Sequence, residues 1–160
     1  MSPEVGLVFL LGSAPICLWI AWCDLSLMRI PNTSLVLLLL VFIVAGPVML
    51  PLDQWGWQLL HLPMILVPAI LLNVLRVIGG GDSKMIAVMS VYVPLSDATD
   101  VLFIWALATL SSILVHRVIR GLPALRPGLD NWRSWHDPGF PLGVPLAITL
   151  ILHLVLVAFT

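Results

Sequence analysis

Six apolar runs, separated by short polar breaks, constrain the fold of this chain more than any other feature of its sequence. The runs cover residues 5–23, 34–50, 59–78, 85–95, 101–115 and 142–159. Only 9% of the 160 residues are charged, whereas about a quarter are charged in a soluble domain. An α-helix needs about 20 residues to cross the apolar core of a bilayer. We therefore expect an all-α, polytopic membrane protein with about six transmembrane helices, in which residues 1–160 form a single membrane-embedded domain.

The basic residues are confined to one side of the predicted membrane topology. Every Lys and Arg lies in or beside the breaks that follow the first, third and fifth runs: Arg29, Arg76, Lys84, Arg117, Arg120, Arg126 and Arg133. The opposite side holds the acidic residues Glu4, Asp53, Asp97 and Asp100 and no basic residue. Loops rich in Lys and Arg stay in the cytoplasm. The pattern therefore predicts that both termini lie outside the cytoplasm.

Two aspartates occur where the surrounding sequence predicts lipid. Asp24 follows the first apolar run and Asp82 precedes the fourth, so both lie towards the cytoplasmic side at similar depth. A charge at the centre of a membrane helix costs about 2.5–3.5 kcal/mol, so such residues are usually functional. The 15 residues from Asp82 to Ser96 span only about 22 Å of helix, less than the ~30 Å core. We expect Asp82 to lie below the membrane surface, approached by a non-helical, glycine-rich segment.

A pair of carboxylates at one depth suits aspartic proteolysis. One carboxylate removes a proton from the attacking water while the other donates a proton to the substrate. Gly79, Gly80 and Gly81 come directly before Asp82, and glycines allow another backbone to approach closely. The structural alternatives are an interfacial aspartate at a helix end for Asp24 and a helix N-cap for Asp82. We expect Asp24 and Asp82 to be catalytic.

Three motifs resemble those of a known family. The segment Gly79-Gly80-Gly81-Asp82-Ser83-Lys84 is similar to the GxGDxK motif of type IV prepilin peptidases, which are GxGD membrane aspartic proteases. Asp24, followed six residues later by Ile30-Pro31-Asn32, is similar to the first motif of that family. Phe140-Pro141-Leu142-Gly143 is similar to its Pro-x-Gly stretch before the last span. The resemblance extends over nearly the whole chain and includes the order of the spans.

The resemblance implies an endopeptidase of the bacterial inner membrane that cleaves leader peptides from prepilins at the cytoplasmic face. The catalytic aspartates of the family correspond to Asp24 and Asp82. Substrate contacts are expected from the motif residues Gly79, Gly80, Gly81, Lys84, Arg29, Pro31 and Asn32. The expected partners are a prepilin, with its apolar N-terminal helix and leader, and the lipid bilayer; self-association stays open. No metal, cofactor or nucleic acid is expected.

The chain is similar to the short, peptidase-only members of this family, such as those of tight-adherence (Flp) pili. Longer members carry an N-terminal soluble domain with paired CxxC motifs that is associated with methylation of the new pilin N-terminus. The two cysteines here, Cys17 and Cys23, form no CxxC motif and lie in the first apolar run. Methyltransferase activity is therefore not expected.

Two other functions remain open for the aspartate pair. A small transporter or assembly subunit would use Asp24 and Asp82 to handle protons or cations, since membrane-embedded carboxylates commonly serve such pathways. An intramembrane protease of the signal-peptide-peptidase kind would also use two aspartates. The segment Ile30-Pro31-Asn32 and the short fourth run argue against this last interpretation.

Overall fold

The computed structural model describes residues 1–122 and 126–160, and within them the regular elements are all helical. Six α-helices follow one another: α1 (Pro3–Leu27), α2 (Asn32–Met49), α3 (Leu52–Val74), α4 (Gly80–Ser90), α5 (Ala98–Gly121) and α6 (Gly143–Phe159). Within the described residues, the 3₁₀ turns η1 (Leu95–Asp97) and η3 (Arg133–Trp135) lie between these helices. By length and hydropathy, α1, α2, α3 and η1–α5 could cross a membrane, and α6 is a shorter apolar helix. The expected all-helical membrane fold is confirmed.

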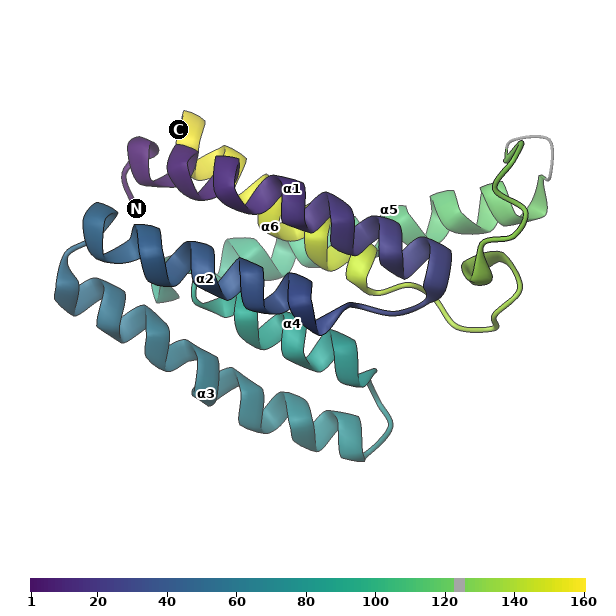
Figure 1. Cartoon of the computed structure of the whole chain (residues 1–160), viewed down its shortest axis with the longest axis horizontal. Helices are drawn as coiled ribbons and strands as arrows, with labels where there is room; N and C mark the ends of the chain where they lie inside the picture. The colour runs from purple at the N-terminus through teal and green to yellow at the C-terminus, as the bar shows by residue number, and fades with distance from the viewer. Residues whose placement is uncertain (123–125) are drawn as a thin grey trace.

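The helices pack side by side, with α6 and α4 in the interior of the arrangement (Figure 1). Helix α1 runs along α6 and also contacts α2, while α5 packs on another side of α6. Helix α4 contacts α2, α3 and α6. Both ends of the chain lie at the same end of the bundle, as an even number of crossings requires. The connections from α1 to α2 and from α3 to α4 lie at the other end.

A buried aromatic cluster holds the end of the bundle opposite these two connections. Phe9 of α1 and Phe42 of α2 stack with ring centroids 5.4 Å apart, and Tyr92 meets each of them edge-on at 5.3 Å. The hydroxyl of Tyr92 donates a hydrogen bond of 2.5 Å to the backbone carbonyl of Leu38. Tyr92 lies two residues beyond the end of α4, so the cluster anchors the far end of this short helix. The 11 residues of α4 span about 16 Å, roughly half of the hydrocarbon core.

Several predicted boundaries were wrong because helices continue beyond the apolar runs. Helix α1 extends to Leu27, so Asp24 lies inside it and not in a polar break covering residues 24–33. Helix α5 extends to Gly121 and takes up residues 116–121, which were predicted to belong to a polar segment ending at 141. Long basic side chains can reach polar surroundings while their backbone stays helical. The end of an apolar run therefore does not mark the end of a helix.

Residues 52–58, in the break between the second and third apolar runs, are also helical and do not form the loop that such a break predicts. Helix α3 begins at Leu52 with Pro51 as its N-cap, and the backbone N–H of Trp55 donates to the carbonyl of Pro51 at 2.8 Å. Gln58, the last residue of the expected loop, is only 1% exposed. The connection between α2 and α3 is therefore only two residues long, residues 50–51.

The fourth helix lies earlier in the chain than predicted. It covers Gly80–Ser90, whereas the apolar run covered residues 85–95. Gly80 and Gly81 form its first turn, so the glycine segment is not the non-helical approach that we expected. Helix α3 correspondingly ends at Val74 and not near residue 78. Hydropathy alone misses these shifts because glycines carry no apolar signal, although they can begin a helix.

Candidate active site

A cavity of about 410 Å³ lies where α1 ends and α4 begins. Its lining residues come from α1, α2, α4 and the connections between helices: Asp24, Met28, Arg29, Ile30, Asn32, Gly79, Gly80, Gly81, Asp82 and Lys84. The structure thus brings together both predicted catalytic residues and six of the seven predicted substrate contacts. Pro31 does not line the cavity; it is the N-cap of α2, with φ −64° and extended backbone.

Asp24 occupies the last turn of α1 and is only 5% exposed. The helix ends at Met28, which adopts a left-handed conformation (φ 54°) and returns its N–H to the carbonyl of Asp24 at 2.9 Å. The Oδ2 atom of Asp24 accepts a hydrogen bond of 2.7 Å from the backbone N–H of Gly143, the first residue of α6. A Cβ atom at residue 143 would lie 2.8 Å from this oxygen. Only glycine therefore fits here without displacing the carboxylate.

Asp82 is the third residue of α4, and Gly79 is the N-cap of this helix. The N-cap interpretation of Asp82 is therefore wrong. A carboxylate in the first turn still interacts favourably with the helix dipole. The side chain of Asp82 points towards Gly79. A Cβ atom at residue 79 would lie only 2.6 Å from its Oδ2 atom. The hydroxyl of Ser83 donates to the carbonyl of Gly79 at 2.9 Å and strengthens the same turn.

Ile30 contacts both α4 and α6 beside the two aspartates, a role that the sequence analysis missed. A Cβ atom at Gly81 would lie 3.3 Å from Cβ of Ile30, and one at Gly143 would lie 3.0 Å from its Cδ1. The side chain of Ile30 therefore packs between the first turns of α4 and α6. The free space at Gly81 is occupied by Ile30, whereas Gly79 and Gly80 remain exposed. The Ile-Pro-Asn motif contained the signal, but its isoleucine has no polar group to suggest a function.

Lys84 and Asn32 link two elements that border the cavity. The Nζ atom of Lys84 in α4 donates a hydrogen bond of 3.1 Å to Oδ1 of Asn32, the first residue of α2. The two residues are 52 positions apart in the sequence. The ammonium group thus connects the α1–α2 corner to the helix that carries Asp82.

Asp24 and Asp82 line the same cavity, so each carboxylate is exposed to the charge of the other. Neighbouring carboxylates do not ionise independently, and one of the two tends to keep a proton. Such a pair can act as a general base and a general acid at the same time. Among the described residues, no three His, Cys, Asp or Glu side chains are grouped so that they could hold a metal ion.

A second cavity, of about 340 Å³, is lined mainly by apolar and aromatic side chains. It lies between α1, α5, α6 and the segment 126–141, and aromatic side chains such as Trp132, Trp135 and Phe140 line it. His116 stacks on Trp135 with ring centroids 4.9 Å apart. No carboxylate belongs to its lining. The acid–base groups that proteolysis requires are therefore found together at the first cavity.

Comparison with known proteins gives one match. A family model described as the type IV leader peptidase family matches residues 11–114. The matched region includes Asp24 and Asp82 and ends within α5, before Gly143 and α6. No curated protein and no solved structure matches the chain. Since the family model covers more than half of the 160 residues, the chain belongs to the type IV leader peptidase family, the membrane aspartic peptidases that remove leader peptides from prepilins.

Proposed function

We propose that Asp24 and Asp82 are the catalytic pair of this prepilin peptidase. The observation that carries the proposal is the cavity of about 410 Å³ that both carboxylates line. Residues 58 positions apart in the chain meet there at the end of the bundle, where a substrate and water can enter. Because both aspartates line this one cavity, the pair is suited to share a proton.

The reaction follows from this arrangement. The ionised carboxylate takes a proton from a water molecule, whose oxygen forms a bond with the carbonyl carbon of the scissile peptide. The protonated carboxyl group then donates its proton to the leaving nitrogen as the C–N bond breaks. Because the N–H of Gly143 bonds to Oδ2 of Asp24, that oxygen is held in place and Oδ1 remains for the water. The products are the released leader peptide and a pilin with a new N-terminus.

The remaining cavity residues suit an extended peptide. Gly79 and Gly80 expose backbone at the cavity, so a substrate strand can pass close to Asp82 without meeting a side chain. Arg29 and Lys84 border the same cavity and add positive charge beside the carboxylates. We propose that the leader enters across these glycines while the apolar pilin helix remains in the lipid beside the bundle. Binding of that helix would orient the scissile bond.

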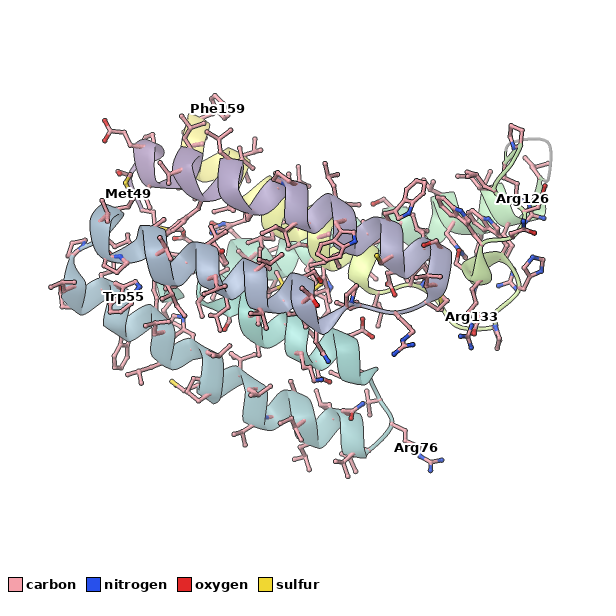
Figure 2. All side chains as sticks on the ribbon, viewed as in Figure 1. Met49, Trp55, Arg76, Arg126, Arg133 and Phe159 are labelled. Atoms are coloured by element: carbon pink, nitrogen blue, oxygen red, sulfur yellow. The ribbon has the colours of Figure 1, made fainter. Side chains whose placement is uncertain are left out.

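We further propose that the cavity faces the cytoplasm of a bacterial cell, that both termini lie on the other side of the inner membrane, and that residues 1–160 act as one domain. The supporting observation is the distribution of charge. Arg76, Arg126 and Arg133 extend from one end of the bundle, whereas Met49, Trp55 and Phe159 lie at the other (Figure 2). Basic residues stay on the cytoplasmic side of membrane proteins, and the cavity lies at the basic end.

The experiment is leader removal from a prepilin co-expressed with the enzyme. Asp24→Asn and Asp82→Asn keep the size of the side chain but remove its acid–base function, so each should slow cleavage at least about 100-fold. Asp100→Asn serves as the matched control because Asp100 is exposed and lies in the first turn of α5, away from the cavity lining. It should process the prepilin at the wild-type rate. Wild-type processing by both cavity variants would exclude the proposed pair.

A further inference from the structure

The connection between α3 and α4 has an ordered geometry that leads directly to Asp82. Helix α3 ends with the two hydrogen bonds of a Schellman motif: the N–H of Val77 donates to the carbonyl of Leu72, and the N–H of Arg76 donates to that of Asn73, both at 2.9 Å. Arg76 adopts the left-handed conformation that this motif requires, with φ 59°. The chain therefore reverses direction within residues 75–79 before α4 begins.

Asn73 ties the two ends of this connection together. Its Nδ2 atom donates a hydrogen bond of 2.9 Å to the backbone carbonyl of Ile78, the residue before Gly79. The same amide faces Gly80, because a Cβ atom at residue 80 would lie 3.6 Å from Nδ2 and 3.8 Å from Oδ1 of Asn73. One side chain in the last turn of α3 thus contacts the peptide before the N-cap of α4 and the first residue of that helix.

The position of Asp82 depends on the backbone that Asn73 holds. Oδ2 of Asp82 lies so close to Gly79 that a Cβ atom there would approach it to 2.6 Å. The chain from Ile78 to Asp82 includes three successive glycines, whose backbone angles are the least restricted of all residues. A rigid link is needed just before them if the carboxylate is to keep one position. The hydrogen bond from Asn73 to Ile78 supplies that link.

We propose that Asn73 is a positioning residue for Asp82, an inference that rests on the proposed catalytic role of that aspartate. Asn73 does not line the cavity, so it acts through the backbone and not on the substrate. Its hydrogen bond is only partly buried, so water can replace it and its contribution to stability is small. Loss of the bond frees residues 78–80 and lets Asp82 leave its place opposite Asp24. The chemical step then slows while substrate binding is retained.

The test measures kcat and KM for leader cleavage by purified variants, together with their thermal unfolding. Asn73→Leu removes the amide at similar side-chain size, and Asn73→Asp keeps the shape but, when ionised, has no donor. Both should lower kcat about 10- to 100-fold, as expected for a displacement of about 1 Å, with KM within about 2-fold of the wild-type value. Asn73→His, whose Nδ1–H can occupy the place of the amide donor, should recover part of kcat. Asn131→Leu is the matched control, because Asn131 is exposed in the segment 126–141, and it should behave as wild type.

Two results would overturn the inference. One is a wild-type kcat for both Asn73→Leu and Asn73→Asp. The other is a loss of kcat that Asn73→His shares fully and that follows a fall in unfolding temperature, since this would reflect stability alone. If Asn73→Leu does not fold, Asn73→Asp carries the test. Failure of the proposed function is recognised separately, by wild-type cleavage in Asp24→Asn and Asp82→Asn.

Discussion

The glycines around the two carboxylates have different steric roles in this site. Gly79 leaves room for Oδ2 of Asp82, Gly143 leaves room for Oδ2 of Asp24, and Gly81 leaves room for Ile30. At Gly80 a Cβ atom would make only ordinary contacts, at 3.6 Å or more, with the amide of Asn73. The GxGD pattern therefore combines positions that must lack a side chain with one that tolerates a small one.

This difference can be tested by a pair of substitutions. Gly79→Ala should reduce kcat for leader cleavage by about 100-fold, because its Cβ atom would lie 2.6 Å from Oδ2 of Asp82 and force the carboxylate out of position. Gly80→Ala, one residue further on, should keep kcat within a few-fold of wild type, because its Cβ atom would not displace the carboxylate; its effect on the passing substrate should appear in KM. Cleavage kinetics with one prepilin substrate compare the two variants directly. Equal activity of both would contradict the steric explanation.

At the scale of elements, the site is built from helix ends. Helix α1 is followed by the left-handed Met28, four residues after Asp24, and the turn after α3 contains the left-handed Arg76, six residues before Asp82. Helix α6 begins at Gly143, whose N–H bonds to Asp24. Backbone N–H and C=O groups lack helical hydrogen-bond partners only at helix ends. A site that uses water is therefore favoured at helix ends in a helical membrane protein. The strained conformation of two non-glycine residues is the cost of these sharp turns.

The left-handed conformation at Arg76 leads to a prediction about stability. An L-residue other than glycine pays about 1–2 kcal/mol there, so Arg76→Gly should be more stable than Arg76→Ala, although both remove the same charge. A difference of about 1 kcal/mol corresponds to roughly 2–4 °C in the unfolding temperature of a chain of this size. Thermal unfolding in detergent would measure it. Identical unfolding temperatures for the two variants would argue against the Schellman motif at this helix end.

At the scale of the whole molecule, the distribution of basic residues and the packing of aromatic side chains both distinguish the two ends of the helical bundle. The cavity with Asp24 and Asp82 lies at the end from which Arg76, Arg126 and Arg133 extend. The aromatic cluster of Phe9, Phe42 and Tyr92 belongs to the other half. The family assignment favours a peptidase over the transporter that the aspartates alone left open. The first turn of the short helix α4 places Asp82 at the basic end of the bundle. The other end of α4 is anchored by the hydrogen bond of Tyr92.

The orientation of the bundle can be measured by cysteine labelling in intact cells. Cys17 and Cys23 are both buried, so the background reaction should be low. A cysteine at the exposed Ser96, between α4 and α5, should react with a membrane-impermeant thiol reagent. A cysteine at the exposed Asn131 should react only after the membrane is permeabilised. The reverse pattern would place the basic end outside the cytoplasm and contradict the proposed topology.

Much of this protein could be predicted from local features of the sequence. The helical membrane fold follows from the apolar runs, because a backbone in lipid must satisfy its own hydrogen bonds. Asp24 and Asp82 were recognisable as functional candidates because charges are costly in such surroundings. The helix ends were harder to locate: α1 passes beyond Asp24, and α4 starts within the glycines. Caps and turns, not hydropathy, determine where these helices begin and end.

The contacts that shape the site depend on packing between distant parts of the chain. Gly143 bonds to Asp24 across 119 residues, and Lys84 bonds to Asn32 across 52. Ile30 fits between α4 and α6, and Asn73 holds the peptide before Gly79. Such contacts arise only when whole helices come together, and no local pattern of charge or hydropathy encodes them. Composition and motifs thus specify a helical membrane peptidase with two aspartates, whereas helix packing brings these aspartates into one cavity and holds them in place.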